Sequence, residues 1–338
     1  VRISLSGKDL SGIDLSGANL QYADLAGAVL TAAHLSGADL SYANLNSASL
    51  ASADLKGCQL AGVDLAGADL SGSDLSGAVM DDCNLTNSKL RGGNLSGATL
   101  RRVTGEKADA VGTVCNDTDF EEARFEEASF RGSSMLRANM AKGVFRKADL
   151  SGTDMKEANL TRVNLEEATV LSAGFFEATL MRANLKSVKA AGADFTLCNL
   201  TGADLTGGNF KRVVFRGAEM SQAVMNVAKF SESDFSYARL TYAAADSSSF
   251  VKSTFRAANL GDAKLRKCRI SGADFSRARM VGCSLLGSDL SGANLTGADL
   301  SRAIVGGTDF SRADMTGAVL VGADLADARL EGTKHSVR

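Results

Sequence analysis

The sequence predicts an all-β solenoid with four sides, and three regularities lead to this prediction. A large apolar residue returns at every fifth position from Leu5 to Leu330, a small residue stands two positions before it, and the 338-residue chain has no proline. Of the 66 positions in the first series, 61 are Leu, Met, Phe, Val or Ile. A short unbroken period is typical of repeat architectures, in which each unit buries its apolar face against the next. Proline would interrupt the continuous backbone pairing of such a stack.

A period of five residues fits neither a helix nor a flat strand. On an α-helix, successive large residues would lie about 140° apart and would spiral around the axis. On a strand, an odd period would send alternate large residues to opposite faces. Each pentad therefore needs a bend, and the Ser-Gly pair that often follows the large residue predicts a type II turn, because glycine tolerates the positive φ that this turn requires.

The phenylalanines predict how many pentads close one coil. Fourteen of the 15 Phe and eight of the nine Met occupy the large apolar position, so this position forms the core. Two series of phenylalanines recur at every fourth pentad: Phe175, Phe195, Phe215, Phe235, Phe255 and Phe275, and Phe210, Phe230 and Phe250. Four pentads per coil would stack each series into a column. At four pentads per coil the chain forms about 16–17 coils, and adjacent coils are expected to lie about 4.8 Å apart, as in any β-ladder.

The complete repeat reads small residue, Asp or Asn, large apolar residue, polar residue, Gly or polar residue. The stretch Ala293-Asn294-Leu295-Thr296-Gly297-Ala298-Asp299-Leu300 shows it. With this pattern the chain resembles the pentapeptide-repeat family, A-(D/N)-L-x-x, over about residues 3–330. The resemblance implies a right-handed quadrilateral β-helix. We expect a single solenoid over residues 1–338, with Leu/Ser/Gly-rich coils at 1–100, Phe-richer coils at 120–330 and a tail at 331–338.

The repeat weakens between residues 101 and 119. Gly105, Ala110 and Cys115 place three small residues in a row at the core position. We interpret 101–119 as an irregular coil or a protruding loop. Loops that leave the solenoid can contact partners in related proteins, so this segment is the leading functional candidate.

Residues suited to catalysis or metal binding are few. His34 stands at an Asp/Asn position of the repeat and His335 in the polar tail. All six cysteines occupy repeat positions, no two are four pentads apart as a disulfide along one wall would require, and there is no CxxC pair. The regular Asp residues are interpreted as partners of backbone N–H groups in the turns. We expect no enzymatic activity, no cofactor and no metal.

The charges predict cross-coil ion pairs and no strong overall field. Formal net charge is −2, with 37 basic and 39 acidic residues. In steps of four pentads the signs alternate along two rows: Arg101-Arg102, Glu121-Glu122 and then Lys142, Arg162 and Arg182, and Glu126-Glu127, Arg146-Lys147, Glu166-Glu167 and Lys186. A protein that mimics DNA needs a continuous acidic face, which this alternation opposes. A DNA-mimicking inhibitor or protector of a type II topoisomerase stays the alternative function, and direct nucleic-acid binding is not expected for want of a broad basic face.

The preferred prediction is a structural or scaffold subunit that binds one or more proteins through a wall or an end. Tyr22 and Tyr42 are expected to stack on each other at an exposed corner, and Phe176 is expected to point outward. The candidate partner-binding residues are Tyr22, Tyr42, Arg101, Arg102, Glu106, Lys107, Glu121, Glu122 and Phe176.

The ends and the compartment remain open. The chain starts at Val1 directly in repeat-like sequence, and no cap is visible there. We expect a further segment, a second copy or a partner to cover this first coil, which allows a homodimer or an end-on contact. No run of 18 apolar residues predicts a transmembrane helix. We expect a cytoplasmic location or, after N-terminal processing, an organellar (plastid) one. The family's abundance in cyanobacteria and plastid-bearing organisms makes attachment to a photosynthetic or other membrane assembly an expectation from resemblance only.

Overall fold

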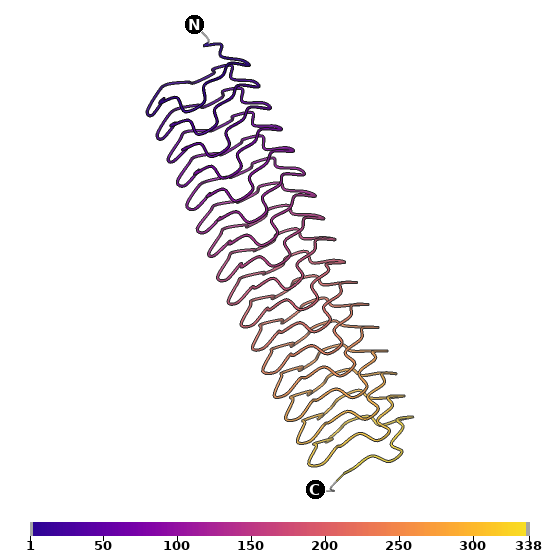
Figure 1. The fold of residues 1–338 in the computed structure, drawn as a ribbon. Helices are drawn as coiled ribbons and strands as arrows, with labels where there is room; N and C mark the ends of the chain where they lie inside the picture. The colour runs from indigo at the N-terminus through magenta and orange to yellow at the C-terminus, as the bar shows by residue number, and fades with distance from the viewer. Residues whose placement is uncertain (1–2, 336–338) are drawn as a thin grey trace. The chain divides into compact units, whose positions relative to one another are not determined.

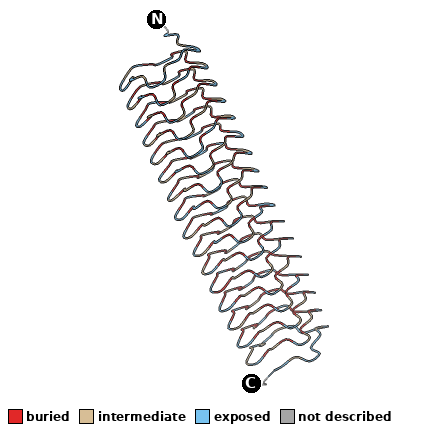
Figure 2. Cartoon of the chain, in the orientation of Figure 1, coloured by how far each residue is buried: buried red, intermediate tan, exposed pale blue. Residues whose placement is uncertain are grey.

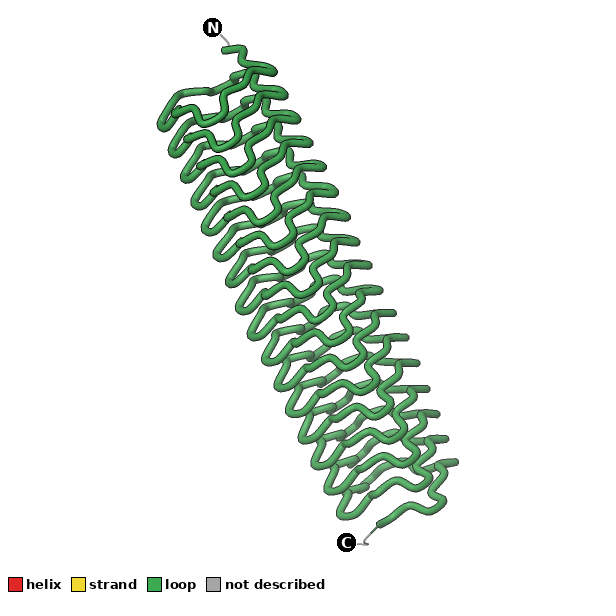
Figure 3. The backbone as a smooth tube through the Cα atoms, in the orientation of Figure 1, coloured by secondary structure: helices red, strands yellow, loops and turns green. Residues whose placement is uncertain are grey.

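The computed structural model describes residues 3–335, and within them the backbone forms neither a helix nor an extended strand (Figure 3). Within residues 3–169 and again within residues 170–335, a pentad contributes one residue to a parallel β-bridge with the equivalent residue four pentads further along, as in Ser4 with Asp24 and Lys189 with Asn209. Because bridged residues are four pentads apart, four pentads make one turn of the solenoid. The predicted four-sided all-β fold is confirmed.

The chain divides into two compact units, Val1–Thr169 and Val170–Arg338. Each unit by itself is a stack of coils with the same four-pentad register (Figure 1). The four walls of a coil are joined by four two-residue corners. The prediction that a single solenoid covers the whole chain stays a prediction.

A turn forms each corner, and nearly all of these turns close with a backbone hydrogen bond. The N–H of the third residue after a core residue donates to the carbonyl of that core residue, as from Lys8 to Leu5 at 3.1 Å and from Ala298 to Leu295 at 2.9 Å. At Val213, Ala228 and Cys268 the N–H donates instead to a serine Oγ of the next coil. The second corner residue has positive φ, 66° at Gly7 and 66° at Gly297. This is the type II turn that the Ser-Gly pairs predicted.

The Asp and Asn residues of the repeat stabilise both the corner and the stacking. The Asp9 carboxylate accepts a hydrogen bond from the Ser11 backbone N–H at 3.0 Å, and many pentads repeat this contact. Some Asn side chains also donate to the residue one coil before, as Asn44 Nδ2 does to Asp24 Oδ1 at 3.1 Å. The regular carboxylates therefore serve the backbone, as expected from the sequence.

The large apolar side chains fill the interior, and between residues 20 and 315 buried residues alternate with less buried ones along the coils (Figure 2). In the second unit Phe175 and Phe195 stack with ring centroids 4.4 Å apart, and Phe255 and Phe275 stack at 4.6 Å. All four rings are fully buried. The predicted phenylalanine column is confirmed, and it gains aromatic stacking in addition to the burial of apolar surface.

Residues 101–119 form a regular coil, which corrects the interpretation of this segment as an irregular coil or loop. Thr104 and Val114 make the usual bridges in both directions, and the turns close as elsewhere. The small core residues are matched by large ones in the next coil. An added Cβ at Gly105 would lie 2.2 Å from the ring of Phe125. Volume in the core is therefore shared between neighbouring coils, so a weak repeat in one coil need not disturb the backbone.

The first and the last described coils bury their large apolar residues less than the coils between them; near the C-terminal end Leu325 and Leu330 are exposed. In the first coil Leu5, Leu10, Ile13 and Leu15 are only half-buried, and Ile3 is exposed, because one neighbouring coil packs against them instead of two. The hypothesis that a further segment, a second copy or a partner covers this coil stays a prediction.

Gly105→Ala tests the shared core volume. We expect it to lower the free energy of unfolding by about 1–3 kcal/mol, because the new methyl group and the Phe125 ring cannot both fit. Denaturant unfolding measures the change. Adding Phe125→Leu to Gly105→Ala should cost less than the two single changes together. A neutral Gly105→Ala variant would contradict the packing described.

Val227→Gly tests the strain of the corners. Val227 is a β-branched residue with φ of 56°, which is unfavourable for a residue with a Cβ. We expect glycine to stabilise the protein by about 1 kcal/mol, the gain being reduced by the greater freedom of glycine in the unfolded chain. The matched control is Gly207→Val, one coil earlier at the same corner with φ of 70°, which should destabilise. Thermal unfolding of both variants should show shifts of opposite sign.

Candidate functional site

Six of the nine predicted partner-binding residues lie along one corner of the first unit. We call this column the docking corner; it consists of the residue pairs 21–22, 41–42, 61–62, 81–82, 101–102, 121–122 and 141–142. The second residue of each pair donates its backbone N–H to the first residue one coil on, as Tyr22 does to Ser41 at 3.0 Å and Arg102 to Glu121 at 3.0 Å. Side chains at equivalent positions of successive coils are thereby held as neighbours.

An aromatic pair occupies one end of the docking corner. The rings of Tyr22 and Tyr42 are 5.4 Å apart and nearly parallel, at 11°, and the residues are 57% and 58% exposed. The Tyr42 ring extends over Gly62, where an added Cβ would lie 2.7 Å from the ring. The predicted stacking is confirmed, and Gly62 is what allows the second ring to lie flat on the corner.

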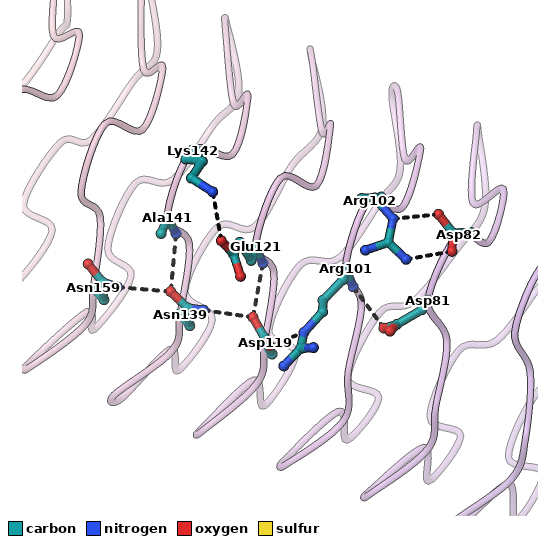
Figure 4. Close-up of polar contacts among 10 residues, drawn as sticks. All are labelled: Asp81, Asp82, Arg101, Arg102, Asp119, Glu121, Asn139, Ala141, Lys142 and Asn159. Carbon is teal, nitrogen blue, oxygen red and sulfur yellow. Dashed lines mark hydrogen bonds and ion pairs between the residues drawn. The ribbon is translucent and has the colours of Figure 1, made fainter.

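Arginines follow further along the docking corner (Figure 4). Arg102 makes a bidentate pair with Asp82 through Nε at 2.8 Å and Nη2 at 2.7 Å. Arg101 donates its backbone N–H to Asp81 at 3.1 Å and its Nε to Asp119 at 2.5 Å. The hydrogen bond from Arg102 holds the pKa of the Asp82 carboxyl below its usual range.

The next coil carries two carboxylates that also pair. Lys142 Nζ contacts both Glu121 Oε1 and Glu122 Oε1 at 3.0 Å, and these contacts raise the pKa of the lysine. Arg101, Arg102, Glu121 and Glu122 line a shallow hollow of about 140 Å³ between the two rows. The corner thus presents an aromatic pair, an acidic row, a basic row and a second acidic row in sequence, with Lys142 after them.

The remaining candidate residues lie elsewhere. Glu106 and Lys107 occupy the adjacent corner of the first unit, where Lys107 is 3.9 Å from Glu127. Phe176 belongs to the second unit and is half-buried, so it is less outward than expected. None of the nine is shown to bind a partner, and the assignment stays a prediction.

The alternating charges of the adjacent corner form the cross-coil ion pairs that the sequence predicts. Arg146 lies 3.4 Å from Glu126 in the preceding coil and 3.7 Å from Glu167 in the following one, and Lys147 lies 4.0 Å from Glu167. All of these side chains are partly exposed, so each pair contributes at most about 1 kcal/mol.

The six cysteine thiols are all buried and unpaired. Burial raises the pKa of Cys58 to about 11 and that of Cys83 to about 12. Within residues 3–335 no group of three or more His, Cys, Asp or Glu side chains is placed to hold a metal ion. No helix in the same part of the chain has the length and apolarity to cross a membrane.

One surface was not found from the sequence. A wall of the second unit, formed by segments 186–192, 206–212, 226–232, 246–252 and 266–272, carries many cations; we call it the basic wall. Its basic residues are Lys186, Lys189, Lys211, Arg212, Lys229, Lys252, Arg266, Lys267 and Arg269, and its acidic residues are Glu232 and Asp246. The expectation that the protein lacks a broad basic face was therefore wrong for this unit. Sorting charges by the four-pentad register would have revealed it.

The repeat, the register and the turns together define a pentad solenoid, and comparison with known families agrees. The model described as "Pentapeptide repeats (8 copies)" matches residues 3–102, 106–135, 137–166 and 178–332. The chain belongs to the pentapeptide-repeat family, whose fold is the right-handed quadrilateral β-helix.

Several solved structures are similar to this chain. HetL, a pentapeptide repeat protein involved in heterocyst differentiation regulation from the cyanobacterium Nostoc, is 25% identical over 75% of this chain and 88% of its own, with a TM-score of 0.23. QnrB1, a plasmid-mediated fluoroquinolone resistance protein, is 19% identical over 68% and 91%, with a TM-score of 0.35. A pentapeptide repeat protein of the Arabidopsis thaliana thylakoid lumen is 31% identical over 38% and 68%, with a TM-score of 0.13. A comparison with curated proteins gave no match.

Arg102→Gln tests the electrostatics of the docking corner. The Asp82 carboxyl has a lowered pKa in the folded protein, so its pairing stabilises the fold above the unfolded-state pKa and is lost as the pH falls through the folded-state pKa. In the variant, the pKa of Asp82 should rise toward the value of about 3.9 of an unperturbed Asp. NMR titration of the carboxyl carbons between pH 2 and pH 6 measures this. Arg137→Gln, which removes the equivalent bidentate partner of Asp117, should leave Asp82 unchanged.

Proposed function

We propose that this protein is a non-enzymatic scaffold that binds another protein through the docking corner. The observation that carries the proposal is the backbone conformation there. Tyr22, Tyr42, Asp82, Arg102, Glu122 and Lys142 all stand at positive φ, where glycine would be favoured. At another corner of the same unit the five equivalent positions from residue 17 to residue 97 are all glycine, and Asp117, Arg137 and Glu157 follow them. An L-residue in this conformation costs about 1 kcal/mol or more relative to glycine.

Strain retained at all positive-φ positions of the docking corner except Gly62 supports a need for these side chains. Positive-φ residues that persist without a gain in packing are a reason to look for function. Tyr22 and Tyr42 are largely exposed, and Arg102 pairs only with another exposed residue. Tyrosine and arginine are also the residues that most often supply binding energy at protein interfaces. The corner therefore suits a protein partner that offers an apolar contact beside carboxylates and cations.

The finer part of the proposal is a place in a larger assembly. From the family resemblance we propose a photosynthetic or other membrane-associated assembly, in which the solenoid spaces or joins other subunits. The repeat itself supports this part, because a stack of regular coils with few residues per coil presents long ordered surfaces to other subunits.

The rival function, mimicry of DNA toward a type II topoisomerase, is less well supported by the charges. A duplex presents one negative charge per about 1.7 Å of its axis. In the first unit Arg101 and Arg102 separate the acidic row Asp81-Asp82 from the acidic row Glu121-Glu122, and Lys142 follows. Each of these three cations forms an ion pair with a carboxylate. These contacts break the acidic surface into short patches.

Changing the docking corner tests the proposal. In affinity purification from the native source, the variant Tyr22→Ser/Tyr42→Ser/Arg101→Ser/Arg102→Ser should recover at least tenfold less of the partner than the wild type, since interface Tyr and Arg residues contribute about 2 kcal/mol each when central. Quantitative mass spectrometry measures the recovery.

The matched control for this experiment is Tyr237→Ser/Tyr242→Ser, which removes exposed tyrosines of the second unit. It should leave recovery unchanged. Equal loss in both variants, or no loss in the first, would exclude the docking corner. Recovery of a type II topoisomerase whose supercoiling activity the protein inhibits would favour the rival function.

A further inference from the structure

The basic wall of the second unit carries more positive charge than its own carboxylates neutralise. Lys186 pairs with Asp204 at 3.2 Å, Lys211 pairs with Glu232 at 3.4 Å, and Arg266 pairs with Asp246. The other six cations form no ion pair within residues 3–335: Lys189, Arg212, Lys229, Lys252, Lys267 and Arg269. All six are exposed.

The backbone register arranges these cations regularly. Lys189, Lys229 and Arg269 belong to one line of bridges, through Asn209 and Ser249, so they stand two coils apart. Two coils correspond to about 10 Å. Arg212 and Lys252 stand on one flanking corner and Lys267 on the other, so the free cations are spread over the width of the wall as well as along it.

The positive surface of the basic wall ends at two aspartates, and exposed apolar side chains lie beside its cations. The next residues on the central line are Asp289 and Asp309, which end the positive surface. Val227, on a corner of the basic wall, is 61% exposed at a φ of 56°. Leu286 is 40% exposed and lines, together with Arg266 and Lys267, an open hollow of about 410 Å³. The strained valine is thus an apolar tip among cations.

We propose that the basic wall docks on an anionic lipid surface. Because equivalent residues of successive coils lie side by side, the wall can present its cations to a flat partner at the same time. Basic clusters with apolar neighbours are the features that bind anionic bilayers. Lys189, Lys229 and Arg269 would lie over lipid headgroups, while Val227 and Leu286 would enter the interfacial region. The assignment concerns a different surface from the docking corner and does not depend on it.

Nucleic acid fits the same surface less well. A duplex is convex, so on a flat wall it would contact mainly the central line and leave the corner cations distant. Single strands are bound by stacking on exposed aromatic rings. The aromatic residues of the basic wall, Phe210, Phe230 and Phe250, are fully buried in the core.

Vesicle co-sedimentation of the full chain tests the proposal. At about 0.1 M salt the wild type should bind vesicles of phosphatidylcholine with 30% phosphatidylserine but not pure phosphatidylcholine, and about 0.5 M salt should release it. Lys189→Gln/Lys229→Gln/Arg269→Gln should weaken binding about 100-fold, since each cation near an anionic bilayer contributes roughly fivefold. Val227→Gly, which we expect to stabilise the fold, should weaken binding about threefold.

The matched control is Arg256→Gln/Arg277→Gln/Arg279→Gln, which removes the same charge from other surfaces of the second unit. It should reduce binding less than threefold. Absence of binding to phosphatidylserine vesicles, or equal loss in both triple variants, would overturn the proposal. Tighter binding to duplex DNA than to vesicles, lost only in the first triple variant, would assign the wall to nucleic acid instead. Retained vesicle binding by the docking-corner variant would separate this result from the proposed function.

Discussion

The type II turn that follows every large apolar residue is the constraint on which the rest of the structure depends. At nearly all corners the turn closes with the hydrogen bond from the third following N–H, and at every corner it bends the chain after the pentad. Four bends return the chain to its starting wall one coil further on, and the bridge between equivalent residues of adjacent coils then fixes the register. Because the register is the same throughout each unit, an inward position meets like positions in the neighbouring coils of that unit. The phenylalanine columns and the Asp/Asn contacts follow from this regularity.

The same register determines which surface residues become neighbours. Tyr22 and Tyr42 stack, and Arg102 reaches Asp82, because four pentads of sequence correspond to one coil of about 4.8 Å. Stability comes from the inward positions and the backbone, so the outward positions can differ from wall to wall. The docking corner in the first unit and the basic wall in the second are two such specialised surfaces on one backbone plan.

The sequence predicted the fold well because a period of five leaves few alternatives. Repeat positions, four pentads per coil, the phenylalanine column and the tyrosine stack all follow from residue spacing. The prediction for 101–119 failed because it judged Gly105, Ala110 and Cys115 one coil at a time, whereas Phe125 in the next coil supplies the missing volume. The basic wall was missed for a related reason: Lys189, Lys229 and Arg269 are eight pentads apart in sequence and dispersed among acidic residues of other walls. No spacing in the sequence says which surface a partner contacts.

Backbone strain connects the fold to the surfaces that we assign. Every corner needs a residue at positive φ, and glycine meets this need at the lowest cost. Where the chain instead places Tyr42, Arg102 or Val227 at that position, it gives up about 1 kcal/mol of stability at each. A solenoid with a well-packed core can tolerate many such losses. Each loss affects one coil and its neighbours, while the stability of the solenoid is a sum over all coils. The distribution of non-glycine corner residues therefore shows where the chain retains a side chain at this cost. By this measure the docking corner is the most specialised corner of the first unit, and Val227 marks the basic wall in the second.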